Sequence, residues 1–200
     1  MNQTQLPDEK QEKREHYIGR ELFDWVETFV FALVAVVIVF TFIFRLVTVD
    51  GRSMNPTLQD GDRLVITDLF YTPHTGDIVV VQRDGADTTP LIKRVIATGG
   101  QKLDIDFDTW TVTVIDFDGT EHVLKEEYVN FMEGYSMAVG TTFSAGDYPI
   151  TIPAGYIFVM GDNRNDSTDS RFSSVGLLKE EYIVGKVICR VFPIGKVRFF

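Results

Sequence analysis

The sequence is poor in the residues that most often build disulfides and metal sites, with one cysteine and three histidines among 200 residues. A single cysteine, Cys189, excludes an internal disulfide framework, because a bridge needs two thiols. The acidic residues lack the spacing of a calcium-binding EF-hand loop, and no cluster of histidines and cysteines suits a transition metal. We therefore expect no metal and no other cofactor.

Basic residues are also scarce. The formal net charge is -10 and the pI is about 4.7. Proteins that bind nucleic acid need clustered lysine and arginine side chains to neutralise phosphates, and no such run occurs beyond the first segment. We therefore expect no nucleic-acid partner. The acidic excess is typical of a soluble, self-repelling surface. The sequence contains no internal repeat and no low-complexity tract.

A long apolar run without a charge extends from Thr28 to Phe44 and continues after Arg45 to Val49. At about 1.5 Å per residue, a helix over residues 26–47 would be roughly 30 Å long, which is the hydrocarbon thickness of a bilayer. A core helix of a soluble protein would show a polar stripe, and this run shows none. We predict a helical N-terminal segment over 1–27, a transmembrane helix over 28–48, and a separate domain over 49–200.

The predicted span has the features of a retained anchor. Its polar leader is long, the apolar run exceeds the usual 7–15 residues of a signal-peptide core, and no small-x-small cleavage site follows. Four basic residues precede the span, and only Arg45 borders it afterwards; the four are Lys10, Lys13, Arg14 and Arg20. The positive-inside rule therefore places the N-terminus in the cytoplasm and the domain outside.

The sequence after the span indicates a mainly β domain. Short apolar segments alternate with turns rich in glycine and aspartate, and we predict strands over 63–67, 77–82, 91–97, 103–107, 110–115, 156–160 and 182–192. Many short strands without a long amphipathic helix are typical of an antiparallel sandwich or barrel-like domain. Residues 131–149 fit neither template and are predicted to form a loop or hairpin insertion. Cys189 is predicted to lie in the core on the last strand.

Ser53 follows the span directly, in the segment Val49-Asp-Gly-Arg-Ser-Met-Asn-Pro-Thr-Leu58. A connecting loop would explain a lone serine here, since a hydroxyl is a poor nucleophile unless a base removes its proton. His16 precedes the span, and neither His74 nor His122 has neighbours that resemble a catalytic triad. The Gly-x-Ser-x-Gly elbow is also missing. A histidine base is therefore not expected.

Lys93 offers another base. It lies in the strand Leu91-Ile-Lys-Arg-Val-Ile96, where most neighbours are apolar. A lysine at this place either protects a sheet edge or is buried. Burial would lower its pKa from about 10.4 towards roughly 7–8, and a neutral amine in that range is a competent general base.

Three separate segments together resemble the type I signal peptidases, the Ser/Lys serine proteases of the export pathway. By itself, the polar segment Met160–Arg171 would suggest only a surface turn. The resemblance covers nearly the whole chain in order: a leading span, Gly51-x-Ser-Met-x-Pro-Thr-Leu58, Gly61-Asp62 before a strand, Lys93-Arg94-Val95, Gly161-Asp-Asn-Arg164, and Ser167-x-Asp-Ser-Arg171. Each piece alone is modest, but the set in this order is specific.

The resemblance implies a role for each matching residue. Ser53 would attack the scissile carbonyl, neutral Lys93 would take the hydroxyl proton and pass it to the leaving amine, and Ser167 would bond and orient the lysine amine. The backbone N–H of Ser53 would contribute to the oxyanion hole. Some relatives have a serine hydroxyl two positions before the nucleophile as a second donor; here that position is Gly51, so the second donor is unassigned.

The resemblance also implies support and substrate contacts. The family's ion pairs would hold the lysine strand against the Ser167 loop; the matching residues are Arg94, Asp162, Asp169 and Arg171. The walls of shallow pockets for the small side chains of Ala-x-Ala sites would be Val49, Asp50, Met54, Leu58, Leu91 and Ile92. The partners would be preprotein signal peptides, the lipid bilayer and the secretion translocon.

Departures from the family pattern are confined to loops. Family members commonly have Gly-x-Pro-Gly-Asp after the lysine strand, where this chain has Ala97-Thr-Gly-Gly-Gln101. After Arg171 the chain reads Phe-Ser-Ser-Val-Gly176, where many relatives have an earlier glycine. A lysine base and a short insertion favour the bacterial type, from a Gram-positive source, over the endoplasmic-reticulum type.

Two alternatives remain at the level of sequence. A self-cleaving Ser/Lys protease, such as the repressors of the DNA-damage response, would share the dyad, but a span and an acidic charge disfavour work on DNA. A non-catalytic, membrane-tethered β-domain would leave the combination of Ser53, Lys93 and Ser167 unexplained.

Overall fold

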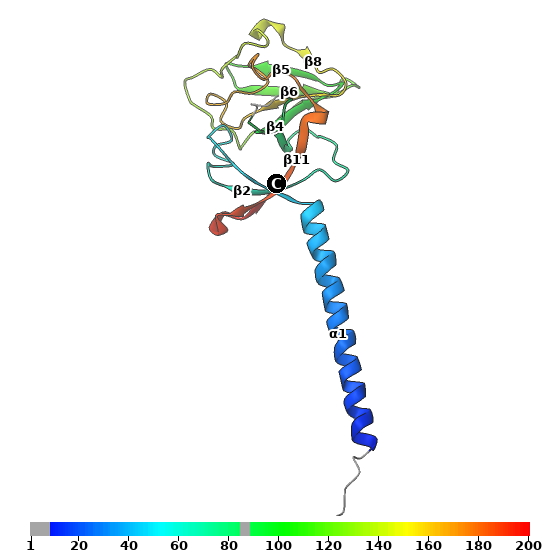
Figure 1. The fold of residues 1–200 in the computed structure, drawn as a ribbon. Helices are drawn as coiled ribbons and strands as arrows, with labels where there is room; N and C mark the ends of the chain where they lie inside the picture. The colour runs from blue at the N-terminus through cyan, green and yellow to red at the C-terminus, as the bar shows by residue number, and fades with distance from the viewer. Residues whose placement is uncertain (1–8, 85–88) are drawn as a thin grey trace, which may run out of the picture. The chain divides into compact units, whose positions relative to one another are not determined.

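The computed structural model describes residues 9–84 and 89–200, and the chain divides into two compact units, Met1–Phe44 and Arg45–Phe200 (Figure 1). The first unit contains the helix α1, Glu9–Phe42. The helix predicted for the N-terminal segment is confirmed from residue 9 onwards. Residues 1–8 of that segment lie outside the described residues.

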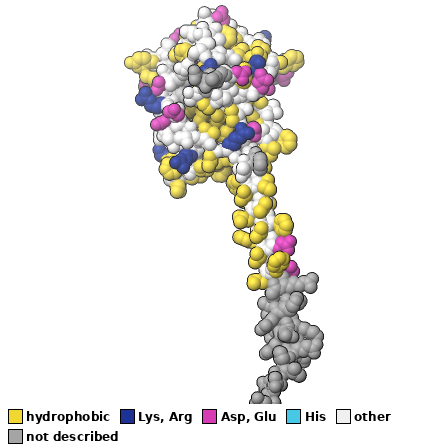
Figure 2. Space-filling model, viewed as in Figure 1, with side chains coloured by type: hydrophobic (Ala, Val, Ile, Leu, Met, Phe, Trp, Pro, Cys, Tyr) yellow, Lys and Arg dark blue, Asp and Glu magenta, His cyan; other side chains and the backbone are white. Residues whose placement is uncertain are grey.

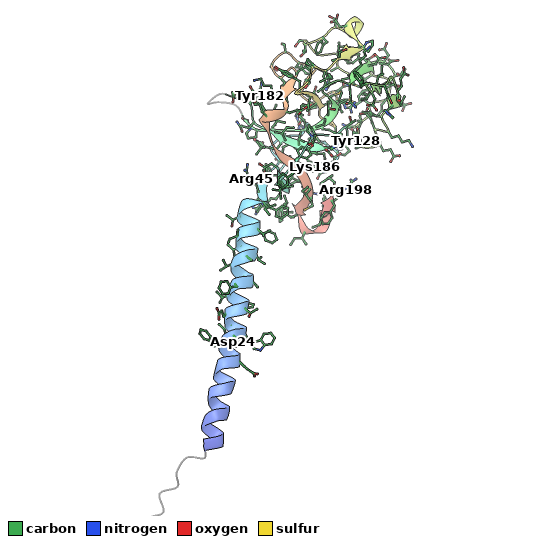
Figure 3. All side chains as sticks on the ribbon, turned by 90° about the vertical axis from the view of Figure 1, so that its right-hand side faces the viewer. Asp24, Arg45, Tyr128, Tyr182, Lys186 and Arg198 are labelled. Atoms are coloured by element: carbon green, nitrogen blue, oxygen red, sulfur yellow. The ribbon has the colours of Figure 1, made fainter. Side chains whose placement is uncertain are left out.

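Helix α1 contains a stretch, Glu21–Thr41, that is long and apolar enough to cross a membrane, and none of it is buried within the protein. Figure 2 shows hydrophobic side chains along this stretch, with acidic side chains only towards its N-terminal part. Asp24, labelled in Figure 3, is one of them. An exposed apolar helix is unfavourable in water, and a bilayer would remove that cost.

The C-terminal end of the predicted span is wrong. Helix α1 ends at Phe42, and Arg45–Thr48 forms strand β1, which pairs antiparallel with β2 from Arg45 opposite Ile66 to Thr48 opposite Arg63. The charge of Arg45 ends the apolar run, and the β-branched side chains of Val47 and Thr48 favour a strand. Hydrophobicity alone could not separate these residues from the helix, because the partner strand begins fifteen residues further along the chain.

The second unit is built from antiparallel β-strands, so the predicted fold class is confirmed. Eight strands form one sheet in the order β1-β2-β11-β3-β4-β9-β10, with β12 paired to β11, and four form a second sheet in the order β7-β6-β5-β8. The remaining bounds are β2 Arg63–Thr67, β3 Ile78–Val81, β4 Leu91–Thr98, β5 Lys102–Asp106, β6 Thr111–Ile115, β7 Glu121–Val123, β8 Ile150–Thr151, β9 Tyr156–Met160, β10 Leu178–Lys179, β11 Ile183–Phe192 and β12 Arg198–Phe199.

All seven strands predicted over this unit are present, with ends that differ by one residue or less. Four additional strands are short: β7 has three residues, and β8, β10 and β12 have two each, too few for an alternating pattern to identify. Cys189 is 9% exposed on β11, as predicted for a core position. The predicted insertion over 131–149 is mostly irregular, with one 3₁₀ turn at Ala145–Asp147.

Three apolar clusters hold the unit together. The largest lies between the two sheets, where Ile96 and Phe158 of the large sheet pack with Leu103 and Val112 of the small one. Figure 1 shows β5, β6 and β8 together in one part of the unit, with β2 and β11 in another. Strand β3 is buried on both faces, since its alternate side chains join the two other clusters. The strand beside it, β4, is therefore held rigidly, and β4 carries Lys93.

Candidate active site

Ser53 lies in a tight turn that follows β1. Gly51 has a φ of +95°, a conformation that a side chain would strain, and its N–H donates to Asp60 Oδ1 at 2.9 Å. The turn is closed by the Asn55 N–H, which donates to the Arg52 carbonyl at 3.1 Å. The Ser53 N–H has no acceptor among the residues that the structure describes, so it remains available to a ligand.

Lys93 is directed at this serine from β4. Its register partner on β3 is Val79, and only 4% of its surface is exposed. The Lys93 amine donates a hydrogen bond to Ser53 Oγ at 2.6 Å. Burial lowers the pKa of Lys93 to about 8, against the attraction of Asp169, which raises it. A lysine with this pKa is partly neutral near neutral pH and can accept a proton.

Two ion pairs lie close to Lys93, and both are buried. The Arg94 guanidinium donates to Asp162 through Nε at 2.8 Å and Nη2 at 2.7 Å. The Arg171 guanidinium donates to Asp169 through Nε and Nη2, each at 2.8 Å. Planar, two-pronged pairs of this kind fix orientation as well as charge. The four supporting residues named from the sequence are thus paired within the Lys93 neighbourhood.

Ser167 does not make the hydrogen bond expected for it. Its hydroxyl donates to Asp169 Oδ2 at 2.8 Å, and within the described part of the chain the Lys93 amine bonds Ser53 alone. The same carboxylate oxygen also accepts the Gly161 N–H at 3.0 Å. An ionised carboxylate is a stronger acceptor than an amine, and this explains why the hydroxyl turns towards Asp169.

Gly161 lies between Ser53 and the Ser167 loop. A Cβ atom at this position would overlap with Ser167 Oγ and with the Ser53 carbonyl oxygen. The absence of a side chain therefore allows β9 and the loop that follows it to approach Ser53 closely. The Asn163 N–H, two residues on, donates to the Ser53 carbonyl at 2.9 Å.

A cavity of about 140 Å³ opens beside the dyad, and its wall includes both Ser53 and Lys93. Five of the six residues predicted to contact substrate line it, and they are Val49, Asp50, Met54, Leu91 and Ile92. Leu58 does not line it, because its side chain is fully buried in the apolar cluster to which Met54 also belongs. The sequence reasoning missed Val47, Thr48, Thr89 and Pro90, which complete the wall. A cavity of this size suits small side chains.

His74 and His122 lie away from Ser53 and Lys93 and do not line the cavity beside them. His74 is near Asp77, with Nδ1 to Oδ2 at 3.8 Å, and His122 is hydrogen-bonded to Asp116 at 2.9 Å. Over the described ranges no group of three or more histidine, cysteine, aspartate or glutamate side chains is arranged to hold a metal ion.

Sequence reasoning also missed a second layer of polar contacts. Arg164, with a fully buried side chain, donates to Glu126, with Nη1 to Oε2 at 3.0 Å. The Arg94 guanidinium lies 3.8 Å from the centre of the Tyr128 ring, a cation–π contact. Arg164 belongs to the motif that carries the resemblance, but Glu126 and Tyr128 belong to no motif, so no local signal could have found them.

On an antiparallel β fold, a buried lysine contacts a serine, and this is an arrangement that a serine hydrolase can use. The family model described as "Signal peptidase, peptidase S26" matches residues 22–192. The chain belongs to this family, and it is a serine endopeptidase of the signal peptidase I type, whose reaction is the removal of signal peptides.

Two bacterial relatives agree with this assignment. Signal peptidase I of Bacillus licheniformis is 32% identical over 180 residues, which cover 88% of this chain and 92% of that protein. Signal peptidase IB of Staphylococcus aureus is 33% identical over 191 residues, covering 90% and 94%. A crystal structure of a signal peptidase I from Enterococcus faecalis has a TM-score of 0.43 and 26% identity, and the match covers 58% of this chain and 97% of that one.

Proposed function

We propose that this chain is a membrane-bound endopeptidase in which Ser53 is the nucleophile and Lys93 the general base. The observation that carries the proposal is the 2.6 Å contact between the Lys93 amine and Ser53 Oγ, made by a lysine that is 4% exposed. Removing a buried ammonium from water favours its neutral form, and the neutral form has the lone pair that a base needs.

The reaction then follows from this geometry. Ser53 Oγ bonds to the scissile carbonyl carbon while its proton passes to Lys93, and the N–H of Ser53 donates to the developing oxyanion. The C–N bond breaks as Lys93 returns the proton to the leaving amine. A water molecule, deprotonated by the same amine, hydrolyses the acyl-enzyme and frees Ser53. One donor in such a hole is worth about 3 kcal/mol in the transition state.

The remaining residues support this machinery. The Arg94–Asp162 and Asp169–Arg171 pairs balance two carboxylates against two guanidiniums around Lys93. Asp169 raises the pKa of Lys93 and Arg171 lowers it. Because these two effects oppose each other, burial remains the main influence on the pKa of Lys93. Ser167 acts through its bond to Asp169, which fixes the carboxylate that faces the amine. Ser167 is therefore proposed as a positioning residue.

The small cavity accounts for the proposed specificity. Apart from Ser53 and Lys93, its wall is mainly apolar, with Thr48, Asp50 and Thr89 as the polar residues, and its volume of about 140 Å³ leaves space for alanine-sized side chains. A tight pocket excludes large groups by overlap, so Ala-x-Ala sites are the proposed substrates. The substrate would bind in an extended conformation along the cavity.

The apolar stretch Glu21–Thr41 supports a single membrane span. Four basic residues precede it and Arg45 follows, so the N-terminus is proposed to be cytoplasmic and the β-unit extracytoplasmic. A signal peptide is itself apolar, and anchoring enzyme and substrate in one bilayer raises their effective concentration. The bilayer and the secretion translocon are therefore proposed partners. A Gram-positive bacterial source also remains a proposal.

The full chain in detergent, mixed with a preprotein that has an Ala-x-Ala site, tests the proposal. Ser53→Ala and Lys93→Ala should each abolish cleavage at that site, while Lys102→Ala, an exposed lysine on β5, serves as the control and should cleave normally. Turnover of the preprotein by either dyad variant at the wild-type rate would refute the dyad. Cleavage of the enzyme alone, with the preprotein left intact, would favour a self-cleaving protease.

A further inference from the structure

Asn163 holds the backbone on both sides of the nucleophile. Its N–H donates to the Ser53 carbonyl at 2.9 Å, and its side-chain Nδ2 donates to the Arg52 carbonyl at 3.2 Å. Asn163 is only 8% exposed, so these bonds are shielded from water. The Arg52 carbonyl and the Ser53 N–H belong to one planar peptide unit. Fixing that carbonyl therefore fixes the direction of the N–H.

The orientation of the Asn163 amide is itself determined by a neighbour. Asn130 Nδ2 donates to Asn163 Oδ1 at 3.1 Å, which leaves the Asn163 NH₂ group directed at Arg52. The Asn130 N–H donates to the Asp162 carbonyl at 3.0 Å, so Asn130 is joined to the same loop twice. An amide with both ends bonded has one preferred orientation.

Asn130 belongs to a short segment, residues 126–130, which we name the strap. It contains a turn in which the Val129 N–H donates to the Glu126 carbonyl at 2.9 Å. Every second side chain of the strap contacts the active-site frame: Glu126 bonds Arg164, Tyr128 covers the Arg94 guanidinium, and Asn130 bonds Asn163. Figure 3 shows Tyr128 within the β-unit, where it lines one cavity together with Lys186 and Arg198.

We propose that Asn163 is a positioning residue for the oxyanion hole and that the strap holds it in place through Asn130. Asn163 aims the Ser53 N–H at the carbonyl oxygen of the scissile bond. A hydrogen bond to the Arg52 carbonyl also polarises the peptide unit and makes its N–H a better donor. The inference rests on the proposed function, since it assigns a role in the reaction of Ser53.

The predicted effect is on the chemical step. Without the Asn163 side chain, the Arg52 carbonyl still accepts the hydrogen bond from the Asn55 N–H but loses the one from Asn163 Nδ2. The oxyanion appears only during the reaction, so its stabilisation affects kcat more than KM. Lys93 is untouched, so the pH at half-maximal activity should not move.

Asn163→Ala and Asn165→Ala in the full chain form a matched pair. Asn165 is the same residue type in the same loop, but it bonds the backbone of Ala138 and Ser136, away from Ser53. We expect Asn163→Ala to lower kcat about 10- to 100-fold, with KM within about threefold and an unchanged pH midpoint. Asn165→Ala should keep kcat within about twofold.

Asn130→Ala tests the strap. Asn130 is exposed, so its replacement should leave the fold intact, and we expect kcat to fall about 3- to 10-fold. In an Asn163→Ala background the same change should have no further effect, because Asn130 acts only through Asn163. If Asn163→Ala does not fold, the kcat of Asn130→Ala alone decides whether the positioning role stands.

Several results would overturn the inference: wild-type kcat in Asn163→Ala or Asn130→Ala, a displaced pH midpoint, or additive losses in the double variant. Ser53→Ala is assayed in parallel. If it still cleaves, the proposed function fails; if it is inactive while Asn163→Ala is normal, only the positioning role fails.

Discussion

Replacing Lys93 by methionine should inactivate the enzyme and at the same time stabilise it at neutral pH. Methionine has a similar unbranched shape and needs no water or charged partner. The pKa of Lys93 is lowered from 10.5 to about 8, chiefly by burial, and this difference corresponds to about 3 kcal/mol at 25 °C. The folded protein bears this cost whenever the amine is charged.

The pH range of the effect follows from the two pKa values. Below pH 8, Lys93 is charged in both the folded and the unfolded chain, so the variant should be more stable by about 3 kcal/mol. Between pH 8 and 10.5 the folded chain loses its proton first, and the unfolding free energy of the wild type rises relative to the variant. Above pH 10.5 Lys93 is neutral in both the folded and the unfolded chain, so its charge no longer contributes to the stability difference between wild type and variant.

Denaturant unfolding of both chains in detergent, at several pH values between 7 and 10.5, measures this difference. The fluorescence of Trp110, which is 8% exposed, reports on the β-unit when Trp25 of the helix is replaced by phenylalanine in both chains. Other titrating groups cancel in the comparison. A stability difference between the two chains that stays constant from pH 7 to 10.5 would refute a buried Lys93 amine with a lowered pKa.

Two further predictions concern the surroundings of the dyad. Gly161→Ala should reduce kcat at least 100-fold while the protein remains folded, because the new Cβ would displace both Ser53 and Ser167; kinetics equal to the wild type would show that the close approach of β9 is not required. Leu91→Ala should enlarge the substrate cavity and raise cleavage after valine relative to alanine about 10-fold, measured with paired preproteins. An unchanged ratio would place the specificity pocket elsewhere.

The sequence predicted the local features of the site better than its long-range ones. Short apolar segments between turns rich in glycine and aspartate identified most strands, because that signal lies within a few neighbouring positions. A lysine among apolar residues left an edge position and a buried one open, and only the resemblance to the signal peptidases decided for burial. Strand β1 was assigned to the helix because hydrophobicity is the same in a membrane and at a sheet edge, and only the pairing with β2 separates them.

The partners of charged groups could not be predicted in the same way. Glu126 reaches Arg164 across 38 residues, and neither has a local pattern that names the other. Ser167 could bond either Lys93 or Asp169, and the choice depends on where β9 places the loop relative to β4. Leu58 was assigned to the substrate pocket from the family resemblance, but its side chain is fully buried in the core.

The pH dependence of kcat/KM for preprotein cleavage by the full chain tests the central claim most directly. If neutral Lys93 takes the Ser53 proton, activity should rise with pH and reach half its maximum near pH 8, where the pKa of the amine lies. A profile that declines above pH 6, or one whose midpoint lies near 10.5, would contradict a buried lysine base.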